Sequence, residues 1–326
     1  MSTKPAPIRI ELPLGIMFQS VNCYLMPGEA LSLIDCGLYT SDNWNLLQEE
    51  LNKQGYQISD LEQIIITHEH RDHIGMLPEI MANSEAKIFA PKAIQGWFEQ
   101  PNKMDREEYI FTQKLFETIG FPDEILRKTH QFFDNREVAR KIEDLDRIQY
   151  VEEGDKLQLG TTSWEVLNTP GHCPAQHIIL EDGSERTFGS DMLLPIAPMP
   201  IPVKGKGELD PAQGALASLL KSYERLKGFE IKDVFPGHGP IFSGANGVID
   251  RQLARIEMRK EECYEAIKHG LTTPYQVNRK MYPYQETPPD FSGLYMVLGY
   301  LQLLQLEGRV RKIEQESGDL YFEAIP

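Results

Sequence analysis

The sequence predicts a layered α/β domain with a helical insertion and a helical domain at its C-terminal end. Apolar runs typical of strands alternate with amphipathic helical runs in residues 8–90 and again after residue 151, which is the pattern of sheets covered by helices. Residues 91–150 interrupt this alternation with a charged, mostly helical pattern, and residues 251–326 have the pattern of three helices and a hairpin. We therefore expect a main domain over residues 1–250, with its insertion at 91–150, and a second domain over 251–326.

The composition is that of an ordinary globular chain. Of the 326 residues, 41% are hydrophobic and 25% are charged, and no apolar run approaches the roughly 20 residues of a membrane-spanning helix. The first residues lack the apolar run of a signal peptide, and the 4 cysteines form no C-x-x-C pair. We therefore expect a cytoplasmic protein that binds no membrane. The formal charge of −16 argues against nucleic acid as a partner.

The first 90 residues predict five strands and two helices of a layered α/β domain. The predicted elements are strands at 8–13, 22–26 and 30–34, a helix at 42–54, a strand at 64–66, a helix at 74–81 and a strand at 87–90. Pro27-Gly28-Glu29 is a turn signal between the second and third strands. The three isoleucines at 64–66 indicate a strand buried on both faces, as in a parallel or mixed sheet.

A cluster of metal-binding side chains follows the isoleucine run directly. The sequence His-Glu-His-Arg-Asp-His at 68–73 has four such side chains in six positions, whereas the whole chain has 8 histidines. Imidazoles and a carboxylate are the ligands that a zinc-like divalent ion prefers. A solvated polar loop rarely has this density of histidine. The spacing allows His68 and His70 to share one ion, and Asp72 and His73 to bind a second.

In these residues the chain resembles the metallo-β-lactamase superfamily, whose first metal motif is H-x-H-x-D-H after a core strand. The flavodiiron branch of that superfamily has Glu at the third position of the motif, where this chain has His70, so the hydrolase branch is favoured. The resemblance implies a four-layer αββα sandwich. It also implies that Asp35, at the end of the third predicted strand, supports the metal motif without binding the metal itself. The local sequence alone fits a plain turn aspartate before Gly37 equally well.

Three later strand ends resemble the superfamily's remaining metal motifs. Strand-like residues at 163–168 end in Thr-Pro-Gly-His, which presents His172, and a later strand ends in Gly-Ser-Asp, which presents Asp191. A third strand ends in Pro-Gly-His-Gly, which presents His238. His177 follows His172 at a spacing longer by one than in similar sequences, so we expect it in the core or behind the ligands.

The resemblance implies a binuclear centre in which Asp72 and Asp191 also take part in catalysis. The first ion would be bound by His68, His70 and His172, the second by Asp72, His73 and His238, with Asp191 bridging both. Zinc is the metal that this ligand set favours, and iron or manganese fits the same set.

The insertion at 91–150 lies between the first and second metal motifs. Its helical pattern is broken at Gly120-Phe121-Pro122, which predicts two helices or three. Its position predicts a cap over the site, and a peripheral decoration is the alternative. The apolar, proline-rich segment from Leu193 to Lys206 predicts one wall of a substrate pocket, with a plain connector as the alternative.

The C-terminal residues resemble the winged helix of one subgroup of these hydrolases. The predicted elements are helices at 248–269, 272–281 and 291–306, then a hairpin of strands at 309–313 and 320–322. Winged helices often bind DNA through the third helix, but residues 291–306 contain no Lys, Arg or His. We therefore expect a packing or dimerisation module, with a homodimer as the possible assembly.

The expected function is a binuclear metal-dependent hydrolase of the hydroxyacylglutathione-hydrolase kind. A hydroxide shared by two divalent ions would attack an ester or thioester of a small acyl substrate. One alternative is a metal-dependent phosphodiesterase or endoribonuclease. A second is a lactone hydrolase, although the lactonases that the chain resembles have Tyr where this chain has Leu194. A third, a binding module without activity, is disfavoured by the intact set of ligands.

Overall fold

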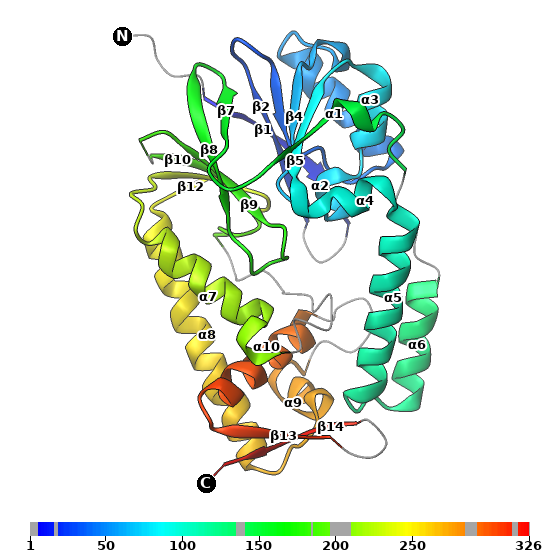
Figure 1. Ribbon diagram of the computed structural model, residues 1–326, viewed down its shortest axis with the longest axis vertical. Coiled ribbons are helices and arrows are strands. Elements are labelled where there is room, and N and C mark those ends of the chain that lie inside the picture. The colour runs from blue at the N-terminus through cyan, green and yellow to red at the C-terminus, as the bar shows by residue number, and fades with distance from the viewer. Residues whose placement is uncertain are drawn as a thin grey trace.

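The structure is a computed structural model that describes residues 6–15, 19–134, 141–183, 185–195, 210–283, 292–314 and 319–325. Within these residues, two six-stranded sheets pack face to face (Figure 1). The first sheet has the order β1 (Ile8–Pro13), β2 (Ser20–Met26), β3 (Ser32–Ile34), β4 (Gln63–Ile65), β5 (Lys87–Pro91) and β6 (Ile148–Val151). The second has the order β12 (Phe242–Ser243), β11 (Asp233–Pro236), β10 (Arg186–Ser190), β9 (His177–Glu181), β8 (Thr162–Asn168) and β7 (Lys156–Leu159).

Strand β4, which carries the isoleucine run, lies inside the first sheet. It pairs in parallel with β3 and with β5, as the run predicted. Its Ile65 points into the apolar layer between the two sheets, while Ile64 points toward the outer helices. Across that layer, Trp164 and Phe188 of the second sheet stack with ring centroids 4.9 Å apart. Burial of both faces explains why the isoleucine run contains no polar residue.

Helices cover the outer face of each sheet and complete the four αββα layers that the resemblance implied. The first sheet is covered by α1 (Ser41–Lys53), α2 (Arg71–Ile74), α3 (Leu77–Asn83) and α4 (Gln95–Glu99). The second is covered by α7 (Ala215–Leu226) and the first turns of α8 (Ala245–Lys268). The hydroxyl of Thr40 caps α1 by accepting from the backbone N–H of Asn43, which explains why the helix begins there.

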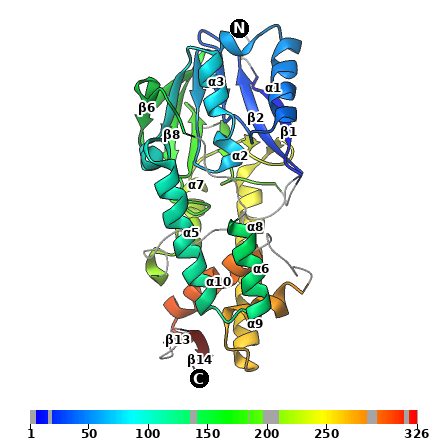
Figure 2. The same ribbon diagram turned by 90° about the vertical axis from the view of Figure 1, so that its right-hand side faces the viewer.

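The insertion forms α5 (Pro101–Thr118) and α6 (Asp123–Asp134), separated at Gly120 as predicted. These helices leave the sheets and extend to the level of the C-terminal helices (Figure 2). Phe116 of α5 packs in one apolar cluster with Leu294 and Leu298. The last residues of the range 91–150, Ile148 to Tyr150, belong to β6 and pair with β5.

The C-terminal elements follow the predicted order of helices and hairpin. They are α9 (Pro274–Met281), α10 (Ser292–Leu306), β13 (Val310–Glu314) and β14 (Leu320–Ala324), of which the two strands pair antiparallel. Helices α7, α8, α9 and α10 share one apolar core. The boundary drawn at residue 250 falls inside α8, so the second sheet and the C-terminal helices are joined by a continuous helix.

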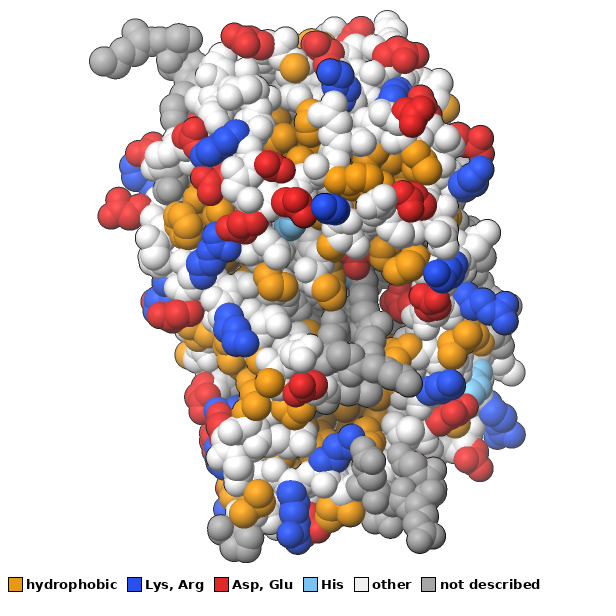
Figure 3. Space-filling view, in the orientation of Figure 1, with side chains coloured by type: hydrophobic (Ala, Val, Ile, Leu, Met, Phe, Trp, Pro, Cys, Tyr) orange, Lys and Arg blue, Asp and Glu red, His pale blue; other side chains and the backbone are white. Residues whose placement is uncertain are grey.

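Charged side chains of both signs are interspersed over the described surface visible in Figure 3. Three of the helices in the described ranges, α5, α8 and α10, are 15 residues or longer. No helix within those ranges combines the length and the apolar character needed to cross a membrane.

Candidate metal centre

The structure brings all seven predicted ligand residues together at the ends of strands from both sheets. The loop after β4 in the first sheet carries His68 and His70, and α2 carries Asp72 and His73. The second sheet supplies the other three from the end of β10 and the loops after β8 and β11; these are Asp191, His172 and His238. The centre therefore lies where the two sheets meet, and neither sheet could form it alone.

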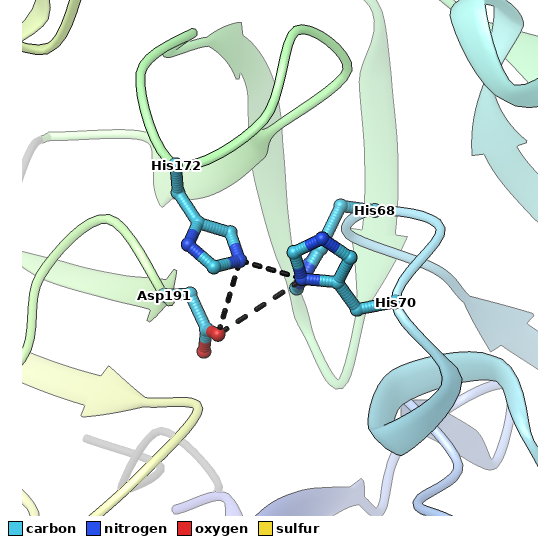
Figure 4. Close-up of side chains that lie close together, drawn as sticks. All are labelled: His68, His70, His172 and Asp191. Carbon is cyan, nitrogen blue, oxygen red and sulfur yellow. Dashed lines mark hydrogen bonds and ion pairs between the residues drawn. The ribbon is translucent and has the colours of Figure 1, made fainter. Parts of the chain in front are cut away.

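The first group of ligand atoms comes from His68, His70, His172 and Asp191 (Figure 4). All of these atoms lie within 4.8 Å of one another. The distance from Asp191 Oδ2 is 3.4 Å to His172 Nε2 and 3.9 Å to His68 Nε2. Ligands about 2.1 Å from a tetrahedral zinc ion are about 3.4 Å apart. The spacing therefore suits a divalent ion at the centre of the group.

The second group contains Asp72, His73 and His238. His238 Nε2 lies 3.5 Å from Asp72 Oδ2. Asp191 also reaches this group, because its Oδ1 lies 3.4 Å from His73 Nε2 and its Oδ2 lies 3.4 Å from His238 Nε2. One carboxylate thus contacts both groups.

The electrostatics of the buried Asp191 suit a bound cation. Among the described residues, neither of its oxygens nor Nε2 of His73 has a hydrogen-bond partner, although buried polar atoms are normally bonded. Burial would raise the pKa of Asp191, but His238 and His73 hold it well below its usual value. Burial likewise would lower the pKa of His73, but Asp191, Asp35 and Asp72 raise it well above its usual value. The centre thus attracts positive charge, and the residues present fit metal ions.

Asp35 orients His73 from the side opposite the centre. It has a left-handed backbone, with φ of 54°, at the end of β3, a conformation that Asp tolerates better than most residues. Its Oδ2 lies 2.8 Å from Nδ1 of His73. The N–H and hydroxyl of Thr67 also donate to the Asp35 carboxylate. With Nδ1 bonded in this way, Nε2 of His73 faces the centre.

Ser190 is a supporting residue that the sequence reasoning missed. It has φ of 42° directly before Asp191, and its hydroxyl lies 2.7 Å from that of Thr67 and 3.4 Å from Nδ1 of His68. Because the Thr67 hydroxyl donates to Asp35, its oxygen accepts from Ser190. The polar residue between Gly189 and Asp191 was the available signal.

The model of the metallo-beta-lactamase superfamily matches residues 16–238. This chain belongs to that superfamily. It is 25% identical over 324 residues to "Probable metallo-hydrolase YqjP" of Bacillus subtilis (strain 168), with 98% of each chain covered. A beta-lactamase domain protein from Burkholderia ambifaria has a similar structure, with a TM-score of 0.81 at 20% identity and coverage of 100% of this chain and 94% of that one. A metallo-beta-lactamase family protein from Thermus thermophilus has a TM-score of 0.79 at 18% identity, with 98% of each chain covered.

Members of the superfamily typically bind divalent metals, and the two ligand groups are placed to do so. His177 is in neither group. Its backbone N–H donates to the carbonyl of Thr67, and burial lowers the pKa of its side chain to about 4, so it is a neutral core residue. Of the predicted pocket wall, residues 196–206 lie outside the described part of the chain.

The loop that presents His238 is held tightly against the rest of the centre. Nδ1 of His238 lies 2.7 Å from the carbonyl oxygen of Ser20 in β2. The side-chain amide of Asn22, also in β2, donates to the carbonyls of Pro236 and Gly239. A Cβ atom at Gly237 would overlap Oδ1 of Asp191 and lie 2.9 Å from Cε1 of His73. Only glycine fits there, so the loop packs directly against ligands of both groups.

Proposed function

We propose that this metallo-hydrolase is binuclear and cleaves an ester or thioester bond in a small acyl substrate. The observation that carries the proposal is the position of Asp191, whose carboxylate contacts ligands of both groups. Divalent ions bound there would polarise the substrate carbonyl and supply a nucleophile near neutral pH by lowering the pKa of water to about 7. We propose zinc as the metal because the ligand set consists of imidazoles and carboxylates.

Asp191 and Asp72 would have different roles because their side chains differ in exposure. Asp191 is fully buried between the two groups, so its role is to set the distance between them. The side chain of Asp72 is 23% exposed, in contrast to His238, which is 1% exposed. Asp72 is therefore the carboxylate placed to exchange a proton with the substrate or with solvent.

Two observations favour an acyl substrate over RNA. Arg309, at the start of the C-terminal hairpin, bonds Glu261 and lies 3.9 Å from the ring centroid of Tyr264, and Arg311 bonds Glu323 at 2.8 Å. Each of these two arginines is therefore paired with a carboxylate, so an approaching polyanion would also meet negative charge. Helix α10, the third helix of the proposed winged helix, is buried against α7 and α8 along most of its length.

A lactone-hydrolase role is less well supported. Leu194 occupies the position where the resembled lactonases have a tyrosine, and it is fully buried. Its carbonyl accepts from the side chain of Gln252 at 2.7 Å. No phenol is available at this position to stabilise charge on a lactone.

The test is a substrate panel on zinc-reconstituted protein. Acyl thioesters, acyl esters, lactones and bis-p-nitrophenyl phosphate are compared by kcat/KM, and metal is counted by mass spectrometry. We expect close to two ions per chain and the highest kcat/KM on a thioester or ester. His70→Ala should lose metal and turnover together. Full activity without metal would refute the proposal. A higher kcat/KM on the phosphodiester would show that the protein is a phosphodiesterase instead.

A further inference from the structure

Arg71 connects the metal-binding loop to the helical insertion. It stands between His70 and Asp72 in the sequence and is the first residue of α2. Its Nη2 lies 3.0 Å from Oδ1 and 3.2 Å from Oδ2 of Asp105 in α5. The side chain of Asp105 is 8% exposed and that of Arg71 is 37% exposed. A charge pair with one buried partner holds its geometry better than an exposed pair.

Helix α2 needs external contacts to keep its position. It contains four residues, Arg71–Ile74, and a helix this short is not stable by itself. Its C-terminal half is fixed to the first sheet, because the carbonyl of His73 accepts from the backbone N–H of Cys36 at 2.8 Å. Its N-terminal residue is fixed by Asp105. Asp72, a member of the second ligand group, lies between these two attachments, and His73, another member, carries the second of them.

Helix α5, which carries Asp105 near its start, is anchored at its far end as well. The carbonyl of Ile119 accepts from the backbone N–H of Tyr275 in α9 at 3.1 Å. Phe121 meets the ring of Tyr275 edge to face, with centroids 5.1 Å apart. An 18-residue helix is about 27 Å long, so α5 reaches from the metal-binding loop to the C-terminal helices and is anchored at both ends.

We propose that Asp105 is a positioning residue of the metal centre, which fixes α2 through Arg71 so that Asp72 and His73 face the second ion. The inference rests on the binuclear centre of the proposed function. Asp105 also has an electrostatic role, since its carboxylate offsets positive charge on Arg71, which stands next to the residues that would bind two divalent cations. The insertion would thus act on the metal centre directly, whatever it contributes to substrate binding.

The experiment is a Co²⁺ titration of the metal-free full chain, followed by visible absorption. In Asp105→Asn the second ion should bind up to about 10-fold more weakly, the lower limit for residues that hydrogen-bond a metal ligand directly, because Asp105 acts through Arg71. The spectrum should change for that ion alone. Glu107→Gln is the matched control, because it removes the same charge from an exposed position of the same helix. The control should bind both ions like the wild type.

A double-mutant cycle separates positioning from a general effect on the fold. Arg71→Gln should weaken the second ion as much as Asp105→Asn, and adding Asp105→Asn to it should change little further. Arg71→Lys, which keeps the charge but loses the planar fork, replaces Asp105→Asn if that variant does not fold, and should also weaken the second ion. Wild-type binding in Asp105→Asn, or additive losses in the double variant, would overturn the inference. A wild type that binds fewer than two ions would instead refute the binuclear centre.

Discussion

The metal-binding loops and the C-terminal helices are stabilised by different interactions. The loops are held by buried hydrogen bonds among a few polar residues, such as Asp35, Thr67 and Ser190. The helices α7 to α10 are held by one large apolar core in which α10 is buried on nearly every side. Polar networks fix directions of atoms, whereas apolar cores fix only shape and volume. Substitutions in the loops should therefore change metal binding, and substitutions in the helices should change stability.

The largest effect is expected from Asp191→Ala. Because this carboxylate contacts ligands of both groups, both ions should be lost together, well beyond the roughly 10- to 100-fold effect of a supporting residue. Metal content after dialysis and kcat/KM on the preferred substrate measure this. Loss of one ion with the other retained would show that the two groups are independent.

A smaller loss is expected from Asp35→Asn. Asparagine keeps the size of the side chain and tolerates the left-handed backbone at this position, but it lacks the charge that holds Nδ1 of His73 in its donor form. Metal affinity should fall by about 10- to 100-fold, mainly for the second ion. Competition with a metal-binding dye gives both affinities. An equal fall for both ions would mean that Asp35 acts on the loop as a whole.

The residues that the structure gathers into the two groups could be picked out from the sequence. The first four stand in one short motif after an apolar run, and the other three follow strand ends in motifs that resemble those of the superfamily. The strands around them were predicted from the apolar runs. Ser190 was missed because its role depends on the position of Thr67, which lies 123 residues away in the chain. Residues that act through a distant partner leave no local pattern.

For the helices, the sequence predicted the elements but not the contacts between them. Their order and approximate bounds were predicted from periodicity, but their partners were not. The charged insertion gave no sign that Asp105 reaches Arg71, or that α5 ends on α9. The strand β6 was included in the insertion because it is only four residues long and follows a long helical pattern. Four residues are too few to show the alternation of apolar and polar side chains that indicates a strand. Domain boundaries, the winged-helix assignment, the homodimer and the cytoplasmic location stay predictions.

The smallest effect is expected from Gly299→Ala in α10. It tests whether the apolar core of the helices affects stability without affecting metal binding. In an open helix this change stabilises by up to about 1 kcal/mol. Here the added Cβ would lie 2.9 Å from Cβ and 3.0 Å from Cδ2 of Leu216 in α7, and overpacking of this kind costs about 1–3 kcal/mol. We therefore expect net destabilisation in urea or thermal unfolding of the metal-loaded protein, with two ions still bound.

Gly247→Ala in α8 is the matched control, because the nearest atom to its added Cβ is Nη1 of Arg251 at 3.7 Å. It should stabilise the protein by up to about 1 kcal/mol, so the two substitutions should have opposite signs. If Gly299→Ala lowered metal content instead, the apolar core of the helices would be setting the geometry of the metal-binding loops. The division between polar networks that direct ligands and an apolar core that supplies stability would then be wrong.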